Sequence, residues 1–403
     1  MEQGNDSGGR RKGSNGPYRP GTGAIVTLVA TGMFLVMGGA AVAPALPAMG
    51  EALHASETAM SLVITLPPLA VAISGLFMGA LADRFGKART LMVSLAVFTV
   101  AGLSGLFLPT LESLLVGRFI MGIGIGGIAA SASALVADYF DEKLRTKIYG
   151  WQSAASGVSV LVLETGGGFL ALLGWRIAFS VYLVGLVGFI LALLFIREPD
   201  HARVRHEGGD APAGAASSPG AVLAIAIAVA FALQAITYLV PAKMPYLVTA
   251  FGESTAVAGL FLGGFGLANI VGSLASAPLQ ARLARSTLTV GCFASLAAGC
   301  ALMAAPFGIG AVLVGAVLIG LGTGCITPAF VNWVASTSTP ENSGKRMGAF
   351  ATAINLGQFS CTLLSGGLLA LFGTHQAVFI AAAMIALAAA VAAALARQFM
   401  NRV

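Results

Sequence analysis

The chain has 403 residues, of which 57% are hydrophobic and only 9% are charged, and its formal net charge at pH 7 is +6. Soluble domains carry about 25% charged residues, so this composition excludes a water-soluble globular fold. We therefore predict an all-α integral membrane protein, because a helix satisfies its own backbone hydrogen bonds in lipid.

Twelve apolar stretches follow one another along the chain, each long enough to cross a hydrocarbon core of about 30 Å. Gly and Ala fill many of them, which favours close helix packing in lipid. The twelve predicted spans are residues 24–49, 58–82, 91–108, 113–139, 151–173, 177–196, 221–250, 255–279, 287–305, 311–336, 349–372 and 377–399. Four cysteines lie inside them, and we expect small apolar packing residues, not a disulfide or metal framework: Cys292, Cys300, Cys325 and Cys361.

The polar ends and loops predict how the chain sits in the membrane. Residues 1–23 are Gly-rich and basic and are expected to form a disordered cytoplasmic tail. With twelve spans both termini share one side, and that side carries all but three of the 22 Lys and Arg residues. The opposite side holds only Arg176. Because positive residues mark the cytoplasmic side, we expect an inner-membrane protein with both termini in the cytoplasm. The same asymmetry accounts for the net charge without a nucleic-acid partner.

A polar stretch divides the chain into two similar halves. Residues 197–220 are charged and then rich in Gly, Ala, Pro and Ser, as in a cytoplasmic linker. They separate a predicted six-helix bundle at 24–196 from a second at 221–399. "LLVGRFIMGIGIGG" (114–127) aligns with "VLVGAVLIGLGTGC" (312–325), and "GGFLALLG" (167–174) aligns with "GGLLALFG" (366–373). Pro44 likewise matches Pro241. Duplicated six-helix halves predict a transporter, with its substrate site at the midplane between them.

The short loop after the second span, "GALADRFGKARTL" (79–91), combines residues with specific local roles. Gly79 is expected to let helices approach closely, and Gly86 to allow a tight turn. We expect Asp83 to accept hydrogen bonds from backbone amides at a neighbouring helix N-terminus, where negative charge is favoured. Arg84 and Lys87 can reach acidic partners on the facing bundle. This ordered string closely resembles the signature loop of the major facilitator superfamily, and the twelve spans, duplicated halves and central linker agree with that resemblance.

Further stretches resemble elements of the same family. "LLVGRFIMGIGIGG" is similar to the fourth-helix motif of proton-coupled members, with Arg118 at its basic position. Asp138 in "LVADYF" stands where relatives carry an acid that pairs with the signature loop and helps latch the outward-open state. The resemblance implies this latch role for Asp138 together with Asp83 and Arg84. "LETGGGFLALLGW" (163–175) resembles the fifth-helix antiporter motif but has Leu163 and Glu164 in place of its Gly-Pro. The second-half loop, "GSLASAPLQARLAR" (272–285), keeps basic residues and loses the acid.

Three ionisable residues lie inside predicted spans and have no charged counterpart in the other half: Arg118, Glu164 and Lys243. A charge at bilayer depth costs at least about 2.5–3.5 kcal/mol, so such residues are candidates for function. Burial disfavours a charged carboxylate and a nearby guanidinium favours it, so Glu164 could load and release a proton. Its alternative is a neutral, hydrogen-bonded Glu in a helix contact. Arg118 could hold an anion, pair with Glu164, bond a carbonyl or extend its charge to the interface.

Lys243 lies in "YLVPAKMPYLV" (238–248), where Pro241 and Pro245 are expected to break the seventh span. It could attract an anionic substrate, gate the pore or extend outward to water. Neutral polar residues in the spans are either helix–helix hydrogen bonds or, as a set, the lining of a moderately polar cavity: Gln152, Gln234, Tyr238, Asn269, Asn332, Asn355 and Gln358. We see no nucleotide-binding loop, metal cluster or nucleophile constellation, so we predict neither an enzyme nor a bound cofactor.

Without an ATP site, an ion gradient must supply the energy, and a proton gradient is the favoured source. The sequence therefore predicts proton-coupled export of a small organic molecule by alternating access, resembling the drug-efflux branch of the family. Glu164 would carry the proton, Arg118 would modulate it, and Lys243 would serve as a substrate or gate residue. The alternatives are a transporter of an anionic metabolite, and a lipid flippase or nontransporting receptor. We expect a monomer in the lipid bilayer, with a small-molecule substrate as its partner.

Overall fold

The computed structural model describes residues 20–199, 219–338 and 343–397, so most of the predicted tail and linker lies outside the described residues. The first half contains α1 (Thr22–Val36), the 3-10 segment η1 (Ala40–Ala45), α2 (Leu46–Ala52), α3 (Glu57–Phe85), α4 (Lys87–Leu103), η2 (Ser104–Leu106), α5 (Leu111–Tyr139), α6 (Glu142–Leu172), η3 (Ile177–Leu183) and α7 (Val184–Phe195). The second half contains α8 (Pro219–Thr237), α9 (Leu239–Ala250), α10 (Thr255–Arg282), α11 (Arg285–Ala304), α12 (Ile309–Ser336), α13 (Ser343–Phe372) and α14 (His375–Leu395). In the described part of the chain, 11 helical segments are long and apolar enough to cross a membrane, and Thr22–Val36 is a shorter apolar helix. The predicted all-α membrane fold is confirmed.

Two spans are interrupted at equivalent places in the two halves. The first span, predicted as continuous, is divided into α1, η1 and α2, with Pro44 inside η1. In the seventh span α8 ends at Thr237 and α9 begins at Leu239. Pro241 cannot donate a hydrogen bond to the carbonyl of Thr237, and its ring crowds that carbonyl, which explains the break just before it. Pro245 lies within α9 without ending it.

The sequence repeat reappears as repeated packing. A Cβ atom built on Gly122 of α5 would lie 2.4 Å from the carbonyl oxygen of Pro67 on α3. In the second half, one on Gly320 of α12 would lie 2.5 Å from the carbonyl oxygen of Phe265 on α10. Gly320 and Phe265 stand in the second half at the positions that correspond to Gly122 and Pro67 when the two motifs are aligned. The glycines of the motif therefore allow close helix crossings, and do not form a phosphate-binding loop.

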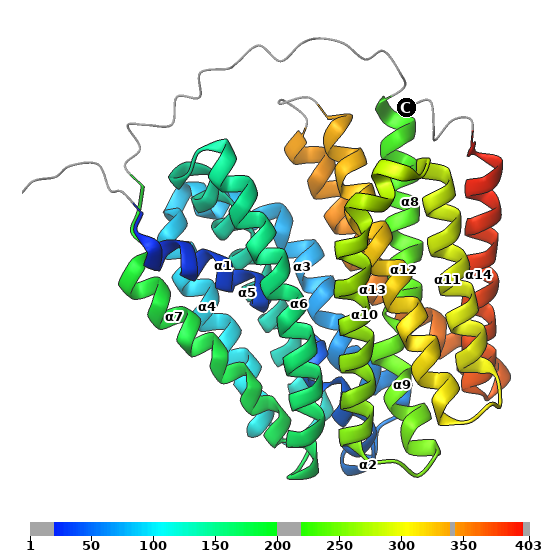
Figure 1. Cartoon of the computed structure of the whole chain (residues 1–403). Helices are drawn as coiled ribbons and strands as arrows, with labels where there is room; N and C mark the ends of the chain where they lie inside the picture. Colours follow the sequence, from blue (N-terminus) through cyan, green and yellow to red (C-terminus); the bar gives the residue numbers. More distant parts are fainter. Residues whose placement is uncertain (1–19, 200–218, 339–342, 398–403) are drawn as a thin grey trace, which may run out of the picture.

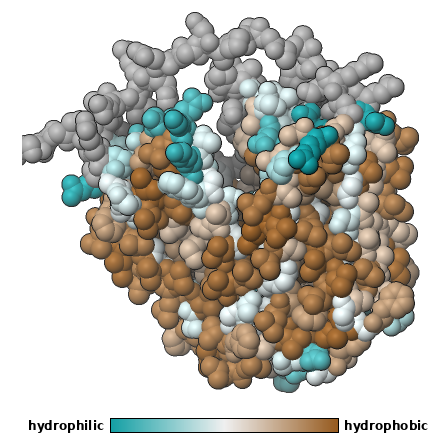
Figure 2. Space-filling model, viewed as in Figure 1, coloured by the Kyte–Doolittle hydropathy of each residue, from teal (hydrophilic) through white to brown (hydrophobic). Residues whose placement is uncertain are grey.

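The two halves meet at one end of the molecule and diverge at the other (Figure 1). We call the end that carries Arg197 and Pro219 the linker end, and the opposite end the far end. Near the far end, Gly168 of α6 lies against Gly259 of α10, and Thr65 of α3 is 2.7 Å from Thr362 of α13. Toward the linker end the surface is notched between the halves (Figure 2). The structure is therefore closed at the far end and open at the linker end.

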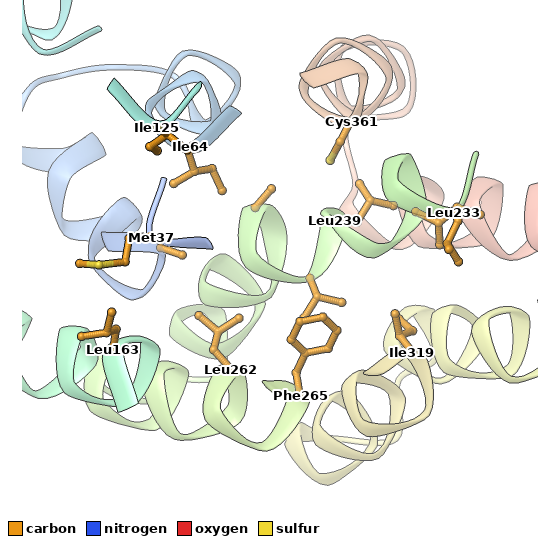
Figure 3. Close-up of a cluster of buried hydrophobic side chains, with 14 of the residues drawn as sticks. Met37, Ile64, Ile125, Leu163, Leu233, Leu239, Leu262, Phe265, Ile319 and Cys361 are labelled. Carbon is orange, nitrogen blue, oxygen red and sulfur yellow. The ribbon is translucent and has the colours of Figure 1, made fainter. Parts of the chain in front are cut away.

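Apolar side chains cover both the outside of the molecule and its centre. Hydrophobic residues dominate the lateral surface in Figure 2, and many of them are exposed, such as Phe107, Leu371 and Leu395. Such a surface matches the hydrocarbon core of a bilayer. Figure 3 shows buried apolar side chains from both halves facing one another at the centre, including Met37, Ile64, Ile125, Leu163, Leu262 and Phe265. The contact between the halves is therefore mainly apolar at this place.

Candidate functional site

Glu164 lies at the contact between the halves and is only 3% exposed. It is on α6, one turn before Gly168, and its carbonyl oxygen is 3.0 Å from a Cβ built on Gly259 of α10. Its carboxylate oxygen Oε2 is buried and has no hydrogen-bond partner in the described chain. The side chain is thus shielded from lipid, and no hydrogen bond fixes the position of Oε2. This is an expensive arrangement for a permanently charged group, because an unpaired buried charge is disfavoured.

Arg118 binds tyrosine rather than Glu164. Its guanidinium Nη1 donates to the hydroxyl of Tyr182 at 2.7 Å, and the group lies over the rings of Phe179 and Tyr182, with 4.6 and 4.9 Å to the ring centroids. Tyr182 donates in turn to the carbonyl oxygen of Met37 at 3.1 Å. Among the described residues no ion pair within 4.0 Å joins Arg118 to Glu164. The Arg118–Tyr182 pair therefore supports the end of α1, where the first span is interrupted.

Tyr238, at the break between α8 and α9, reaches across to the first half. Its hydroxyl donates to the carbonyl oxygen of Ile64 at 3.3 Å and lies 2.7 Å from a Cβ built on Gly39. It also interacts electrostatically with Glu164, Tyr182 and Arg118. Tyr182 and Tyr238 thus approach the interruption of the first span from the two halves.

Lys243 does not extend outward to water. Its side chain is 0% exposed, and its ammonium nitrogen lies 3.9 Å from Glu57 Oε2. Glu57 is on α3, so this pair joins the two halves near the far end. Sequence reasoning overlooked Glu57, because it stands at the start of a span and resembles an ordinary first-turn acid at a helix N-terminus.

The neutral polar residues are brought together only in part. Gln358 donates to Gln234 at 3.4 Å, between α13 and α8. Gln152 donates to the carbonyl oxygen of Leu28 at 2.8 Å, which makes it a helix–helix bond inside the first half. Asn355 donates to its own helix at Ala351. The backbone of Asn269 packs against Gly324, and the side chain of Asn332 is exposed. The prediction that these residues line a cavity as one set is therefore not supported by their contacts.

The signature loop is organised around Gly86 and Lys87. Gly86 has a φ of +101°, a conformation that favours glycine, as expected for the tight turn. Lys87 forms an ion pair with Asp138 of α5, with 2.6 Å between Nζ and Oδ2. The expected pairing of Asp138 with this loop is therefore present, but it lies within the first half. Lys87 was expected to reach the facing bundle, and the divergence of the halves at this end keeps it on its own side.

Glu198 takes the role that was expected of Asp83. Its carboxylate accepts hydrogen bonds from the amides of Lys87 at 2.6 Å and Ala88 at 3.0 Å. These amides open α4, where a carboxylate is favoured by the helix dipole. Asp83 is exposed, as is Arg84, which lies beside the ring of Phe85. The sequence pattern missed Glu198 because it is 111 residues from Lys87 in the chain.

Gly79 is not at a close helix contact in this structure. A Cβ atom added at this position would have nothing within 4 Å. No helix therefore approaches the backbone there in this conformation, in which the halves are apart at the linker end.

Replacing Glu198 by Ala is expected to lower the free energy of unfolding by about 0.5–2 kcal/mol, the usual cost of losing a helix cap. Thermal unfolding of purified protein in detergent measures this. Glu142→Ala is the matched control, because Glu142 lies in the first turn of α6 while Asp141 caps that helix. Equal unfolding temperatures for the two variants would contradict a capping role for Glu198.

Comparison with known proteins agrees with this architecture. The sequence profile of the Major Facilitator Superfamily matches residues 28–244 and 223–399. The chain is 29% identical over 177 residues to Multidrug resistance protein 1 of Bacillus subtilis, covering 43% of this chain and 46% of that protein. It is 27% identical over 261 residues to the class B Tetracycline resistance protein of Escherichia coli, covering 61% of this chain and 62% of that one. The aligned parts thus span about half to three-fifths of these relatives.

The fold is also found in solved structures. The crystal structure of a D-xylose-proton symporter superposes with a TM-score of 0.77 at 15% sequence identity, covering 92% of this chain and 96% of that one. At this identity the likeness shows the fold alone. Together with the profile, which covers nearly all of the described helices, it leads to one conclusion: the chain is a multi-pass membrane protein that belongs to the Major Facilitator Superfamily.

Proposed function

We propose that the protein exports a small organic molecule in exchange for protons. The observation that carries this proposal is Glu164, a carboxyl group buried at the contact of α6 with α10 and left without a partner at Oε2. A helix contact that separates and reforms would expose this group to each side of the membrane in turn. Glu164 can then take up a proton on one side and lose it on the other.

The apolar contact between the halves, which would separate during transport, supports a largely apolar substrate. Met37, Ile64, Leu163 and Phe265 are among the hydrophobic side chains that face one another there (Figure 3). The two cations proposed for an anionic substrate have other contacts: Arg118 donates to Tyr182, and Lys243 has Glu57 at ion-pair distance. These contacts favour an uncharged or cationic organic substrate over an anionic metabolite. Resistance proteins among the relatives, named for tetracycline and for multiple drugs, are consistent with this choice.

The direction of transport rests on the orientation proposed from the positive residues. They place the linker end in the cytoplasm, so the present conformation, open at that end, would admit substrate from inside the cell. Closure at the linker end with opening at the far end would release it outside. The ion pair of Lys87 with Asp138 and the cap by Glu198 would hold the signature loop in the shape that this exchange requires.

Purified protein in liposomes tests the proposal. With a pH-sensitive dye enclosed and a pH gradient imposed, ethidium and tetracycline serve as organic probes, and benzoate serves as the anionic one. We expect at least one of the first two probes to be accumulated only when the gradient is present, with protons moving the opposite way. Gradient-driven movement of benzoate alone would instead support the anionic alternative, and organic transport that is indifferent to the gradient would contradict proton exchange.

A further inference from the structure

Four side chains join the two halves near the far end. Glu57 comes from the first turn of α3, Lys243 and Tyr246 come from α9, and His375 is the first residue of α14. The carboxylate of Glu57 stands between two cationic groups, with Lys243 Nζ at 3.9 Å and His375 Nε2 at 3.3 Å. The rings of Tyr246 and His375 are stacked with 6.3 Å between centroids, and Lys243 Nζ is 5.8 Å from the centroid of Tyr246. We call these four residues the far-end cluster.

The far-end cluster is partly buried and has few hydrogen bonds. Lys243 is fully buried, whereas the side chains of Glu57 and His375 keep 32% and 21% of their exposure. Four of its polar atoms have no hydrogen-bond partner in the described chain: Glu57 Oε2, Lys243 Nζ, Tyr246 OH and His375 Nδ1. The cluster therefore connects the halves through the 3.3 Å contact of Glu57 with His375 and the longer 3.9 Å ion pair of Glu57 with Lys243. Such a contact separates more readily than a fully hydrogen-bonded pair.

We propose that Glu57, Lys243 and His375 form an electrostatic latch that holds the far end of the transporter closed and that tightens when His375 is protonated. Glu57 is the only one of the three that belongs to the first half, so both ion pairs that join the halves in the latch include Glu57. Alternating access, on which this inference rests, requires the latch to break whenever the far end opens. Its partial exposure gives His375 access to protons from that side of the membrane.

The charges around His375 set the direction of the pH response. Glu57 on α3 is the charged group in contact with the imidazole, at 3.3 Å, and Lys243 on α9 lies on the other side of that carboxylate, at 3.9 Å. Glu57 interacts electrostatically with His375 and Lys243. The other helices packed on α14 carry no charge at this end: α8 has none, and the charged residues of α11 and α13 are at the linker end. Because Glu57 is the nearest charge, we expect acid to favour the closed far end and alkali to release it.

Distances across the far end test the latch without a transport assay. Cysteines replacing Phe107 and Phe307, which are 80% and 75% exposed in far-end loops of the two halves, can carry spin labels. The four native cysteines are buried, and a chain without introduced cysteines measures background labelling. In the labelled wild type, we expect the short-distance population to grow as the pH falls from 8 to 5.5. Glu57→Gln and Lys243→Met should each raise the open-to-closed ratio by about fivefold, the upper end of what a solvent-exposed ion pair contributes.

Matched variants separate the latch from a general loss of structure. Glu112→Gln changes an exposed acid in the first turn of α5 and should leave the distances unchanged. His375→Gln should remove the pH response while retaining a closed population, and His375→Lys should hold the far end closed at both pH values. Unchanged distances in Glu57→Gln and Lys243→Met would overturn the latch, and a full pH response in His375→Gln would overturn the role of His375. Either result leaves the proposed proton exchange through Glu164 open to its own test.

Discussion

Replacing Glu164 by Gln is expected to reduce gradient-driven accumulation of substrate to the level of protein-free liposomes. Gln has nearly the same shape as Glu but cannot bind or release a proton, so the helix contact of α6 with α10 should survive while coupling is lost. Exchange of labelled for unlabelled substrate, which needs no net proton movement, should remain measurable. The two assays on the same liposomes, with and without a pH gradient, therefore separate coupling from binding.

The control for this variant is Glu112→Gln, which also removes one carboxylate from the first half but at an exposed position at the far end. Its accumulation should equal that of wild type. If Glu164→Gln still accumulated substrate in response to the pH gradient, another group would have to carry the proton. If exchange were lost together with accumulation, Glu164 would instead be needed for binding or for the fold.

Replacing Gly168 by Leu should prevent closure of the far end. A Cβ atom at Gly168 would lie 2.7 Å from the carbonyl oxygen of Thr255 and 2.8 Å from the Cα atom of Gly259, and these are backbone atoms of α10 that cannot turn aside. Overpacking of this kind costs about 1–3 kcal/mol, and about 1.4 kcal/mol is a tenfold change in an equilibrium. We expect the closed population to fall by about tenfold or more, with a comparable loss of transport.

Gly166 provides a control only two residues away on the same helix. A Cβ atom there would have nothing within 4 Å, so Gly166→Leu adds the same side chain without touching α10. Spin labels at positions 107 and 307 report closure in both variants. Long distances in Gly168→Leu and wild-type distances in Gly166→Leu are expected. Similar distances in the two variants would mean that the crossing of α6 with α10 does not control the far end.

The helices could be predicted from the sequence because a backbone in lipid must satisfy its hydrogen bonds within the chain. Apolar length, glycine content and the internal repeat predicted the helical membrane fold, and Pro241 and Pro245 predicted the interruption of the seventh span, although Pro245 lies within α9. The interruption of the first span was missed, although Pro44 aligns with Pro241, because its hydrophobic pattern continues without a polar gap through residue 49. Short-range features such as Gly86 were also predictable, since a tight turn depends on its own residues.

Contacts between segments that are distant in the chain could not be predicted from the sequence. The sequence by itself determined that Arg118, Glu164 and Lys243 are charges within predicted spans, since hydrophobic residues surround each of them along the chain, but it left open whether Arg118 and Lys243 extend to the interface. Only the tertiary structure decided their partners: Tyr182 for Arg118, Glu57 for Lys243, and none at Oε2 for Glu164. The tertiary structure likewise decided that the first amides of α4 donate hydrogen bonds to Glu198 and not to Asp83. The reason is that hydropathy fixes how deeply a residue lies, whereas its partner depends on helix rotation and on which ends of the two halves are in contact.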